Sequence, residues 1–220
     1  MQPQFPVLIE AGSDRDLSKW FGNNRATIEA LLNGPGAVLL RGFDIATELN
    51  FAEFVKQFSK DVLQYVNRST PRTDLGQGIY TATEYPAGLT IPLHNENAFQ
   101  RDWPLRIIFF CLHPADKGGG QTPLANTLRV TRRIDGEICR KFEEKQIMYI
   151  RNYRPDIDIP WQTAFQTESR SEVEQYFIKN GISFEWTGPD ALRTRQVCQA
   201  FAKHPRTGSV IWFNQAQLQP

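Results

Sequence analysis

The stretch IPLHNENAF, residues 91–99, places a histidine and a glutamate two positions apart. The apolar residues 91–93 lead into this pair, as in a β-strand that leaves the core and ends in a turn. Alternate side chains of a strand point to the same face, so His94 and Glu96 are predicted to lie side by side.

An imidazole nitrogen and a carboxylate oxygen at this spacing can bind one metal ion from a single strand. They would supply two of the three ligands of a 2-His-1-carboxylate site, which leaves one face of a non-haem Fe(II) open. The neighbouring Asn95 and Asn97 are polar but uncharged, whereas a solvated strand more often carries lysine or arginine. A hydrogen-bonded, partly buried histidine is the structural alternative.

Composition narrows the class of protein. The 220 residues carry a formal net charge of +1, so no global field attracts nucleic acid or a membrane surface, and small or neutral partners are expected. Neither a secretory signal nor a long apolar window is present, which predicts a cytoplasmic protein. We expect a single domain over residues 1–220. The three cysteines, which form no C-x-x-C pair, are expected to be buried.

Hydrophobic spacing and turn residues give a coarse set of elements. Helices are predicted over residues 24–33, around residues 134–142 and roughly over residues 191–203. Two more are predicted from capping boxes: one starts at Asn50 with Glu53 as its partner, and the other starts at Ser171 with Glu174 and stops at Gly181. Strands are predicted at residues 37–43, around 79–81, at 105–112 and at 209–216. Residues 66–90 are predicted to form a loop, and a turn with three glycines follows the strand at residues 105–112.

A series of motifs along the chain resembles one known family. The motifs are GAVLLRGF at 36–43, YTATEYP at 80–86, IPLHNENAF at 91–99, FFCLHPADKGGGQTPLAN at 109–126, RNY at 151–153 and HPRTGSVIWFNQA at 204–216. In this order they resemble the TauD/TfdA family of Fe(II)/2-oxoglutarate-dependent dioxygenases, in its SyrP-like and clavaminate synthase-like branch. The resemblance implies a mainly β fold with flanking helices, a double-stranded β-helix (jelly-roll, cupin-like) barrel.

The resemblance also implies roles for particular residues. His94 and Glu96 match the family's first metal ligands, which serve Fe(II) in catalysis. Thr122 matches the threonine that helps to hold 2-oxoglutarate, although it could be an ordinary loop threonine. Tyr80 and Asn95 lie where family members shape the substrate pocket, and a packing role is the alternative for Tyr80. The implied activity is hydroxylation or desaturation of a small molecule by O2, with an amino-acid-like or secondary-metabolite substrate, as in antibiotic biosynthesis.

Part of the family's site has no match in the sequence. The family's second histidine and an arginine for 2-oxoglutarate lie in strands beyond the WFNQA motif, and the sequence stops at Pro220. The barrel is therefore expected to lack its last strands, as in a fragment or a degenerate homologue. A non-catalytic jelly-roll domain that binds a ligand or partner without turnover is the alternative function.

The remaining histidines and nearby polar residues are given other roles. His113 and His204 are expected to pack at a turn or a helix end, not to bind metal. Arg68 and Arg72 could bind a substrate anion or be solvated loop residues. In this branch a histidine usually occupies the position of Gln217. The change is expected to affect local packing or a substrate contact more than metal binding.

Overall fold

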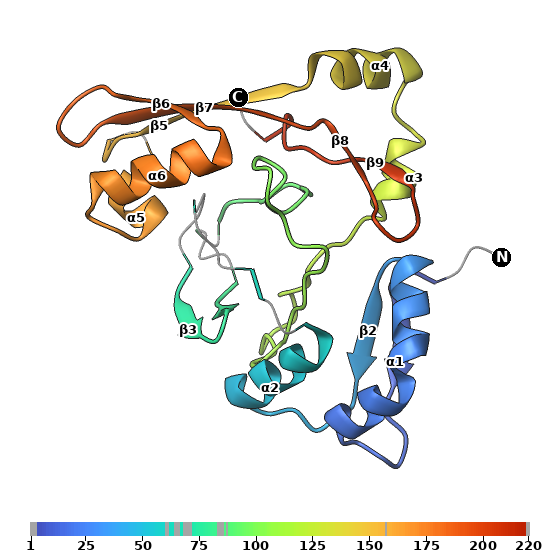
Figure 1. Ribbon diagram of the computed structural model, residues 1–220. Coiled ribbons are helices and arrows are strands. Elements are labelled where there is room, and N and C mark those ends of the chain that lie inside the picture. Colours follow the sequence, from blue (N-terminus) through green and yellow to red (C-terminus); the bar gives the residue numbers. More distant parts are fainter. Residues whose placement is uncertain are drawn as a thin grey trace.

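The computed structural model describes residues 4–59, 62–63, 67, 72–82, 86, 88–156 and 158–218. Within them there are nine strands and six helices. Figure 1 shows how these elements are arranged. The N-terminal elements are β1 (Val7–Glu10), α1 (Leu17–Asn33), β2 (Val38–Arg41), α2 (Glu48–Phe58), β3 (Asp74–Gly76) and β4 (Ile79–Tyr80). The later elements are α3 (Thr127–Thr131), α4 (Gly136–Lys145), β5 (Ile147–Tyr153), α5 (Trp161–Phe165), α6 (Arg170–Asn180), β6 (Ser183–Trp186), β7 (Leu192–Cys198), β8 (Phe201–Lys203) and β9 (Val210–Trp212).

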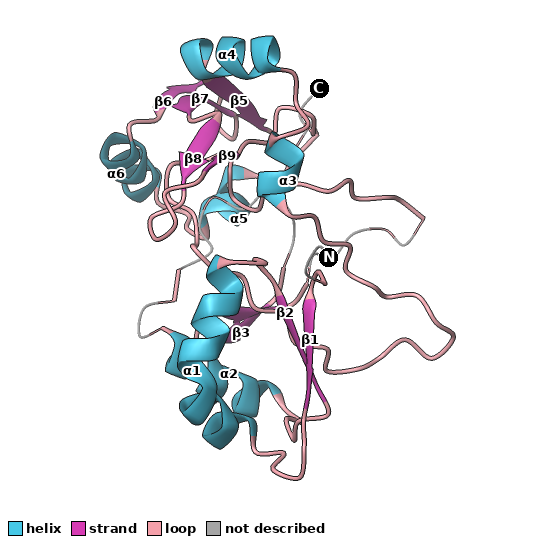
Figure 2. Ribbon diagram, turned by 90° about the vertical axis from the view of Figure 1, so that its right-hand side faces the viewer, coloured by secondary structure: helices cyan, strands magenta, loops and turns pink. Residues whose placement is uncertain are grey.

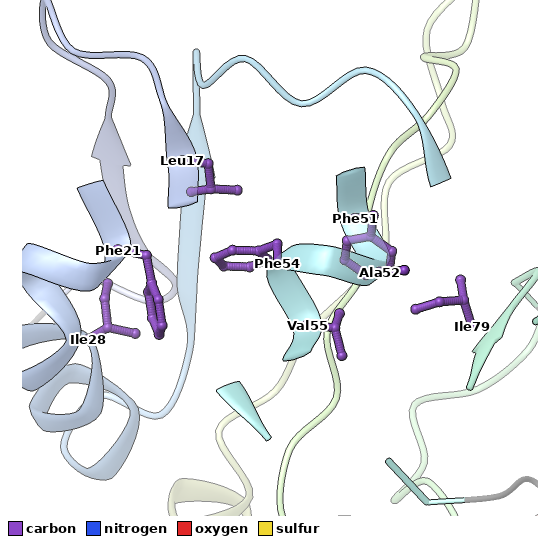
Figure 3. Packing of buried hydrophobic residues seen from close by; sticks show 8 residues of the cluster. All are labelled: Leu17, Phe21, Ile28, Phe51, Ala52, Phe54, Val55 and Ile79. Atoms are coloured by element: carbon purple, nitrogen blue, oxygen red, sulfur yellow. The ribbon is translucent and has the colours of Figure 1, made fainter. Parts of the chain in front are cut away.

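The N-terminal part buries one apolar cluster. β1 and β2 pair in parallel, and the amphipathic helices α1 and α2 pack through aromatic side chains. Figure 3 shows Phe21 of α1 facing Phe54 of α2, and their ring centroids are 5.3 Å apart in an edge-to-face arrangement. Ile79 of β4 approaches α2 from the other side (Figure 3). The predicted strand at residues 37–43 is confirmed as β2.

Three helices, α1, α2 and α6, begin upstream of their predicted starts because other residues cap them. Asp16 accepts a hydrogen bond from the Lys19 backbone and begins α1. Thr47 caps α2 and Ser169 caps α6, each through its hydroxyl oxygen, so the capping boxes predicted from Asn50 and Ser171 were wrong. An oxygen that accepts from a free N–H of the first turn fixes where a helix starts.

The C-terminal part contains a three-stranded antiparallel sheet in the order β5-β7-β6. Helices α5 and α6 cover one of its faces, where Tyr153 and Leu192 of the sheet pack with Trp161, Phe165 and Phe177 of the helices. Figure 2 shows this sheet, with α4 and α6, at the opposite end of the molecule from α1, α2 and β2. Gly181 ends α6 with a φ of 63°, as predicted.

The helix predicted over residues 191–203 is wrong, because this segment forms β7 and β8. In β7 the buried side chains alternate with outward ones, and the buried positions include Thr194 and Gln196. The amide of Gln196 donates to the backbone oxygen of Asn180 at 3.1 Å. Because polar residues occupy inward positions of β7, its apolar residues do not recur at every second position, which is the pattern that marks a strand. β9 confirms the strand predicted at residues 209–216, over a shorter range.

The prediction of a strand at residues 105–112 is wrong, because this segment pairs with no strand among the described residues. Its exposure still alternates. Ile108 and Phe110 pack on the N-terminal cluster, and Phe110 stacks on Phe51 with centroids 5.2 Å apart. Ile107 and Phe109 remain 49% and 63% exposed. The segment is therefore extended, with one buried face.

The architecture as a whole consists of strands with flanking helices. Four small sheets are present in the described residues, and none of them closes into a barrel. The jelly-roll barrel and the single domain over residues 1–220 stay predictions. None of the described helices has the length and apolar character needed to cross a membrane.

Candidate metal site

His94 and Glu96 come together as predicted, with their outer atoms facing each other. His94 Nε2 lies 3.3 Å from Glu96 Oε2, and the two side chains are 29% and 21% exposed. The other ring nitrogen, Nδ1, lies 2.9 Å from the backbone oxygen of Pro92. A carbonyl oxygen only accepts, so Nδ1 carries the hydrogen and donates it. Nε2 is then the nitrogen available to a metal ion.

The backbone around the pair differs from the predicted strand. Residues 91–95 belong to no strand among the described residues, and a turn over residues 96–99 follows as predicted. Asn97 has a φ of 57°, a left-handed conformation that asparagine adopts more readily than most residues. Pro92 has no N–H to give to a ladder, which removes one strand hydrogen bond. The pair therefore stands on an irregular arm, residues 91–95, that leads into the turn over residues 96–99.

The electrostatics of the pair favour an ionised carboxylate. The hydrogen bond to Glu96 raises the pKa of His94 above its usual value, and burial partly opposes this. Burial raises the pKa of Glu96, but the hydrogen bond from His94 and the charge of Arg72 outweigh it and lower the pKa overall. A proton or a metal ion between the two groups would relieve the repulsion between an imidazole lone pair and a carboxylate.

Arg72 is a third member of the cluster. Its Nη2 lies 3.1 Å from Glu96 Oε1, and both side chains are 21% exposed. The loop position of this arginine predicts a substrate anion or solvent as its partner, whereas the structure places it against the carboxylate of Glu96. Its presence in the cluster was not predicted, because 24 residues separate Arg72 from Glu96. Arg68 lies outside the described residues.

Side-chain amides fasten the arm to the C-terminal strands. Asn95 donates through its amide to the backbone oxygens of Trp212 and Asn214, at 3.3 and 3.1 Å. The side-chain amide of Gln215 donates in return to the backbone oxygen of Asn95 at 2.7 Å. Gln217 lies 3.4 Å from the Leu93 oxygen, directly before His94. In the sequence, the polar residues that follow β9 were the signal for these contacts with the arm, but only Gln217 among them was considered.

Two other predicted site residues, Thr122 and Tyr80, lie in different segments of the chain from His94 and Glu96. Thr122 lies in an exposed, irregular segment shortly after Gly118, Gly119 and Gly120, all of which have positive φ. Tyr80 is half-buried in β4, opposite Asp74 in the register of the β3–β4 hairpin. Their roles at 2-oxoglutarate and at the substrate stay predictions, as does a substrate role for Asn95.

The remaining histidines lie in irregular or turn segments, and the helix end expected at His204 is wrong because β8 precedes it. His113 is exposed in the segment after residues 105–112. His204 Nδ1 accepts from the backbone N–H groups of Arg206 and Thr207 in the β8–β9 turn, at 3.3 and 3.1 Å. Across the described part of the chain, no group of three or more His, Cys, Asp or Glu side chains could hold a metal.

The donor set nevertheless suits a divalent ion. One imidazole nitrogen and one carboxylate oxygen are ligands that Fe(II), Mn(II) and Zn(II) share in proteins. Neighbouring ligand atoms on an ion with bonds of about 2.1 Å lie roughly 3 Å apart in an octahedral arrangement, close to the separation of His94 Nε2 and Glu96 Oε2. The two residues therefore fit one ion between them with little movement.

Comparison with known proteins defines the class to which this fold and site belong. The model of the taurine catabolism dioxygenase TauD, TfdA family matches residues 2–219. The chain therefore belongs to this family, and the resemblance drawn from its motifs is confirmed.

Two curated relatives narrow the comparison to a branch. The dapdiamide synthesis protein DdaC of Enterobacter agglomerans is 42% identical over 216 residues, which cover 98% of this chain and 65% of the relative. The clavaminate synthase-like protein At3g21360 of Arabidopsis thaliana is 31% identical over 198 residues, covering 85% of this chain and 59% of the relative. The chain thus spans less than two thirds of the length of these relatives. The printed name of the Arabidopsis relative agrees with the clavaminate synthase-like branch.

Proposed function

We propose that this chain provides the metal-binding part of an Fe(II)/2-oxoglutarate-dependent oxygenase that hydroxylates or desaturates a small molecule. The observation that carries the proposal is the 3.3 Å separation of His94 Nε2 and Glu96 Oε2, with Nδ1 turned to the Pro92 oxygen. Membership of the TauD/TfdA family supports Fe(II) and 2-oxoglutarate as the cofactors and a jelly-roll barrel as the complete fold.

Each residue has a defined task in this proposal. His94 and Glu96 hold the metal, and the Pro92 carbonyl fixes the ring of His94 so that Nε2 faces the ion. Thr122 would donate a hydrogen bond to the distal carboxylate of 2-oxoglutarate, a charge-assisted contact that orients it. Fe(II) with 2-oxoglutarate and O2 supplies the oxidising chemistry for an unactivated C–H bond.

The substrate class is proposed from the relatives. The printed name of DdaC places that protein in dapdiamide synthesis, which supports an amino-acid-like or secondary-metabolite substrate here. Tyr80 and Asn95 are proposed to border the substrate. The amide of Asn95 already donates to the backbone near β9, so this residue would act mainly by shaping the pocket wall.

A non-catalytic domain that binds a ligand without turnover is the second candidate. It is favoured by the finding that only His94 and Glu96, and no group of three potential ligands, converge within the described ranges. Two protein ligands hold an ion less firmly than three.

Anaerobic addition of Fe(II) and 2-oxoglutarate separates the two candidates. We expect a weak visible charge-transfer band in the wild-type chain, its loss in Glu96→Ala and its retention in His204→Ala, followed by succinate release when O2 is admitted. A band without succinate would favour the non-catalytic candidate. Absence of both the band and succinate would contradict the oxygenase.

A further inference from the structure

The carboxylate of Glu96 is contacted from both sides by cationic or cation-capable groups. Oε1 accepts from Arg72 Nη2 at 3.1 Å, while Oε2 faces His94 Nε2 at 3.3 Å. A glutamate has three side-chain torsions, and its last torsion is broad and weakly restrained. Two contacts on different oxygens therefore define an orientation that the side chain would not keep by itself.

Arg72 stands on a structured element that can act as a support. It lies two residues before β3, and Thr73 exchanges hydrogen bonds with Thr81 at the open end of the β3–β4 hairpin. The Thr73 N–H donates to Thr81 Oγ1 at 2.8 Å, and the Thr81 N–H donates to the Thr73 oxygen at 3.0 Å. The base of the hairpin therefore fixes the backbone next to Arg72.

We propose that Arg72 is a positioning residue of the metal site, which holds Oε1 of Glu96 and leaves Oε2 as its single metal-binding oxygen. This inference rests on the proposed function, because it assigns Arg72 a role toward the same ion. A carboxylate engaged in this way binds metal through one oxygen and leaves one more coordination position for 2-oxoglutarate or O2. Partners of metal ligands commonly orient those ligands, and their loss typically lowers metal affinity about 10- to 100-fold.

Charge alone makes the opposite prediction. Arg72 is positive and lies close to the position of a divalent cation, so its removal would strengthen metal binding if its electrostatic effect dominated. Orientation predicts weaker binding instead. The sign of the change in metal affinity therefore distinguishes a positioning residue from a bystander.

The test uses Co(II), whose visible spectrum reports coordination number and whose binding does not depend on turnover. We expect Arg72→Met to weaken Co(II) binding about 10- to 100-fold and to alter the band intensity, because the Glu96 carboxylate is no longer held in one orientation. Arg72→Lys keeps the charge and one donor, so we expect it to recover part of both signals.

Arg106→Met is the matched control. Arg106 pairs with Glu29 in an ion pair of similar burial, with side chains that are 21% and 19% exposed. Glu29 lies in α1 and is not part of the candidate metal site. We expect this variant to keep the wild-type Co(II) affinity and spectrum, and thermal unfolding of each variant shows whether it is folded.

The outcomes separate this inference from the proposed function. If Glu96→Ala loses Co(II) binding while folded Arg72→Met binds as tightly as wild type or more tightly, the role of Arg72 is overturned and the metal site stands. If wild type binds no Co(II), or His94→Ala and Glu96→Ala bind it normally, the metal site itself is wrong and the role of Arg72 falls with it. If Arg72→Met does not fold, the partial loss expected in Arg72→Lys decides the question.

Discussion

At the scale of single residues, His94 has an acceptor at each ring nitrogen. Pro92 supplies a backbone carbonyl to Nδ1, and Glu96 supplies a carboxylate to Nε2. An imidazole in this setting must either carry two hydrogens or share its Nε2 lone pair with a cation. The same contacts raise the pKa of His94 and favour a proton on Nε2, so a metal ion at this site would take the place of that proton.

The cysteines provide a residue-scale prediction with a pH dependence. Cys198 is buried and its thiol contacts the Phe99 oxygen at 3.4 Å, and burial raises its pKa to about 11. Cys111 is exposed, contrary to the expectation that all three cysteines are buried. Because the thiolate is the nucleophile, iodoacetamide at pH 8 should alkylate Cys111 rapidly and leave Cys198 unmodified in the folded chain.

Mass spectrometry of the peptides checks this outcome, and denatured protein serves as the control in which both cysteines react. A folded state that keeps Cys198 protonated is stabilised below the ordinary thiol pKa of 9.0 and loses that stabilisation as the pH rises toward about 11. Rapid modification of Cys198 at pH 8 would contradict its buried position.

At the scale of elements, sequence patterns succeeded for β2 and for the end of α6, and failed for β7, whose buried face carries polar residues. The apolar run at residues 37–43 predicted β2, and Gly181 correctly predicted the end of α6. β7 was mistaken for a helix because Thr194 and Gln196 occupy buried positions. Spacing and motifs predicted the His94–Glu96 pair, but a contact that spans 24 residues, such as Arg72 with Glu96, leaves no local pattern.

The contact between Gln215 and Asn95 gives an element-scale prediction. Gln215 is 5% exposed and its amide bonds the Asn95 oxygen, so Gln215→Ala leaves that carbonyl without this donor. We expect the free energy of unfolding to fall by about 1–3 kcal/mol in urea titrations. Gln162→Ala is the control, because Gln162 makes an exposed bond to Asp190, and its loss should cost less than about 0.5 kcal/mol. Equal effects of the two substitutions would contradict a supporting role for Gln215.

At the scale of the whole molecule, the extended segments around the site leave apolar side chains uncovered. Residues 91–93 expose Ile91 and Leu93, and residues 105–109 expose Leu105, Ile107 and Phe109. A jelly-roll barrel, which stays a prediction for this chain, would cover such faces with paired strands. In the described residues, sheets that do not close and apolar side chains that stay exposed therefore occur together.

This exposure predicts that the chain binds an apolar dye. Because Ile107 and Phe109 lie on one side of an extended segment, they form a patch that can bind anilinonaphthalene sulfonate. The double substitution Ile107→Thr and Phe109→Lys should reduce the dye fluorescence severalfold. Ile178→Thr is the control, because this residue is 74% exposed on α6, away from that segment, and its change should have little effect. Unchanged fluorescence in the double variant would show that this face is covered in solution.

The central claim is that His94 and Glu96 bind one divalent ion, and a Mn(II) titration followed by electron paramagnetic resonance tests it most directly. Free Mn(II) gives a sharp six-line signal that is broadened when the ion binds to protein. We predict binding of a single Mn(II) that Fe(II) displaces, its loss in His94→Ala and in Glu96→Ala, and its retention in His204→Ala. Binding that survives both site substitutions, or no binding by the wild-type chain, would contradict the account.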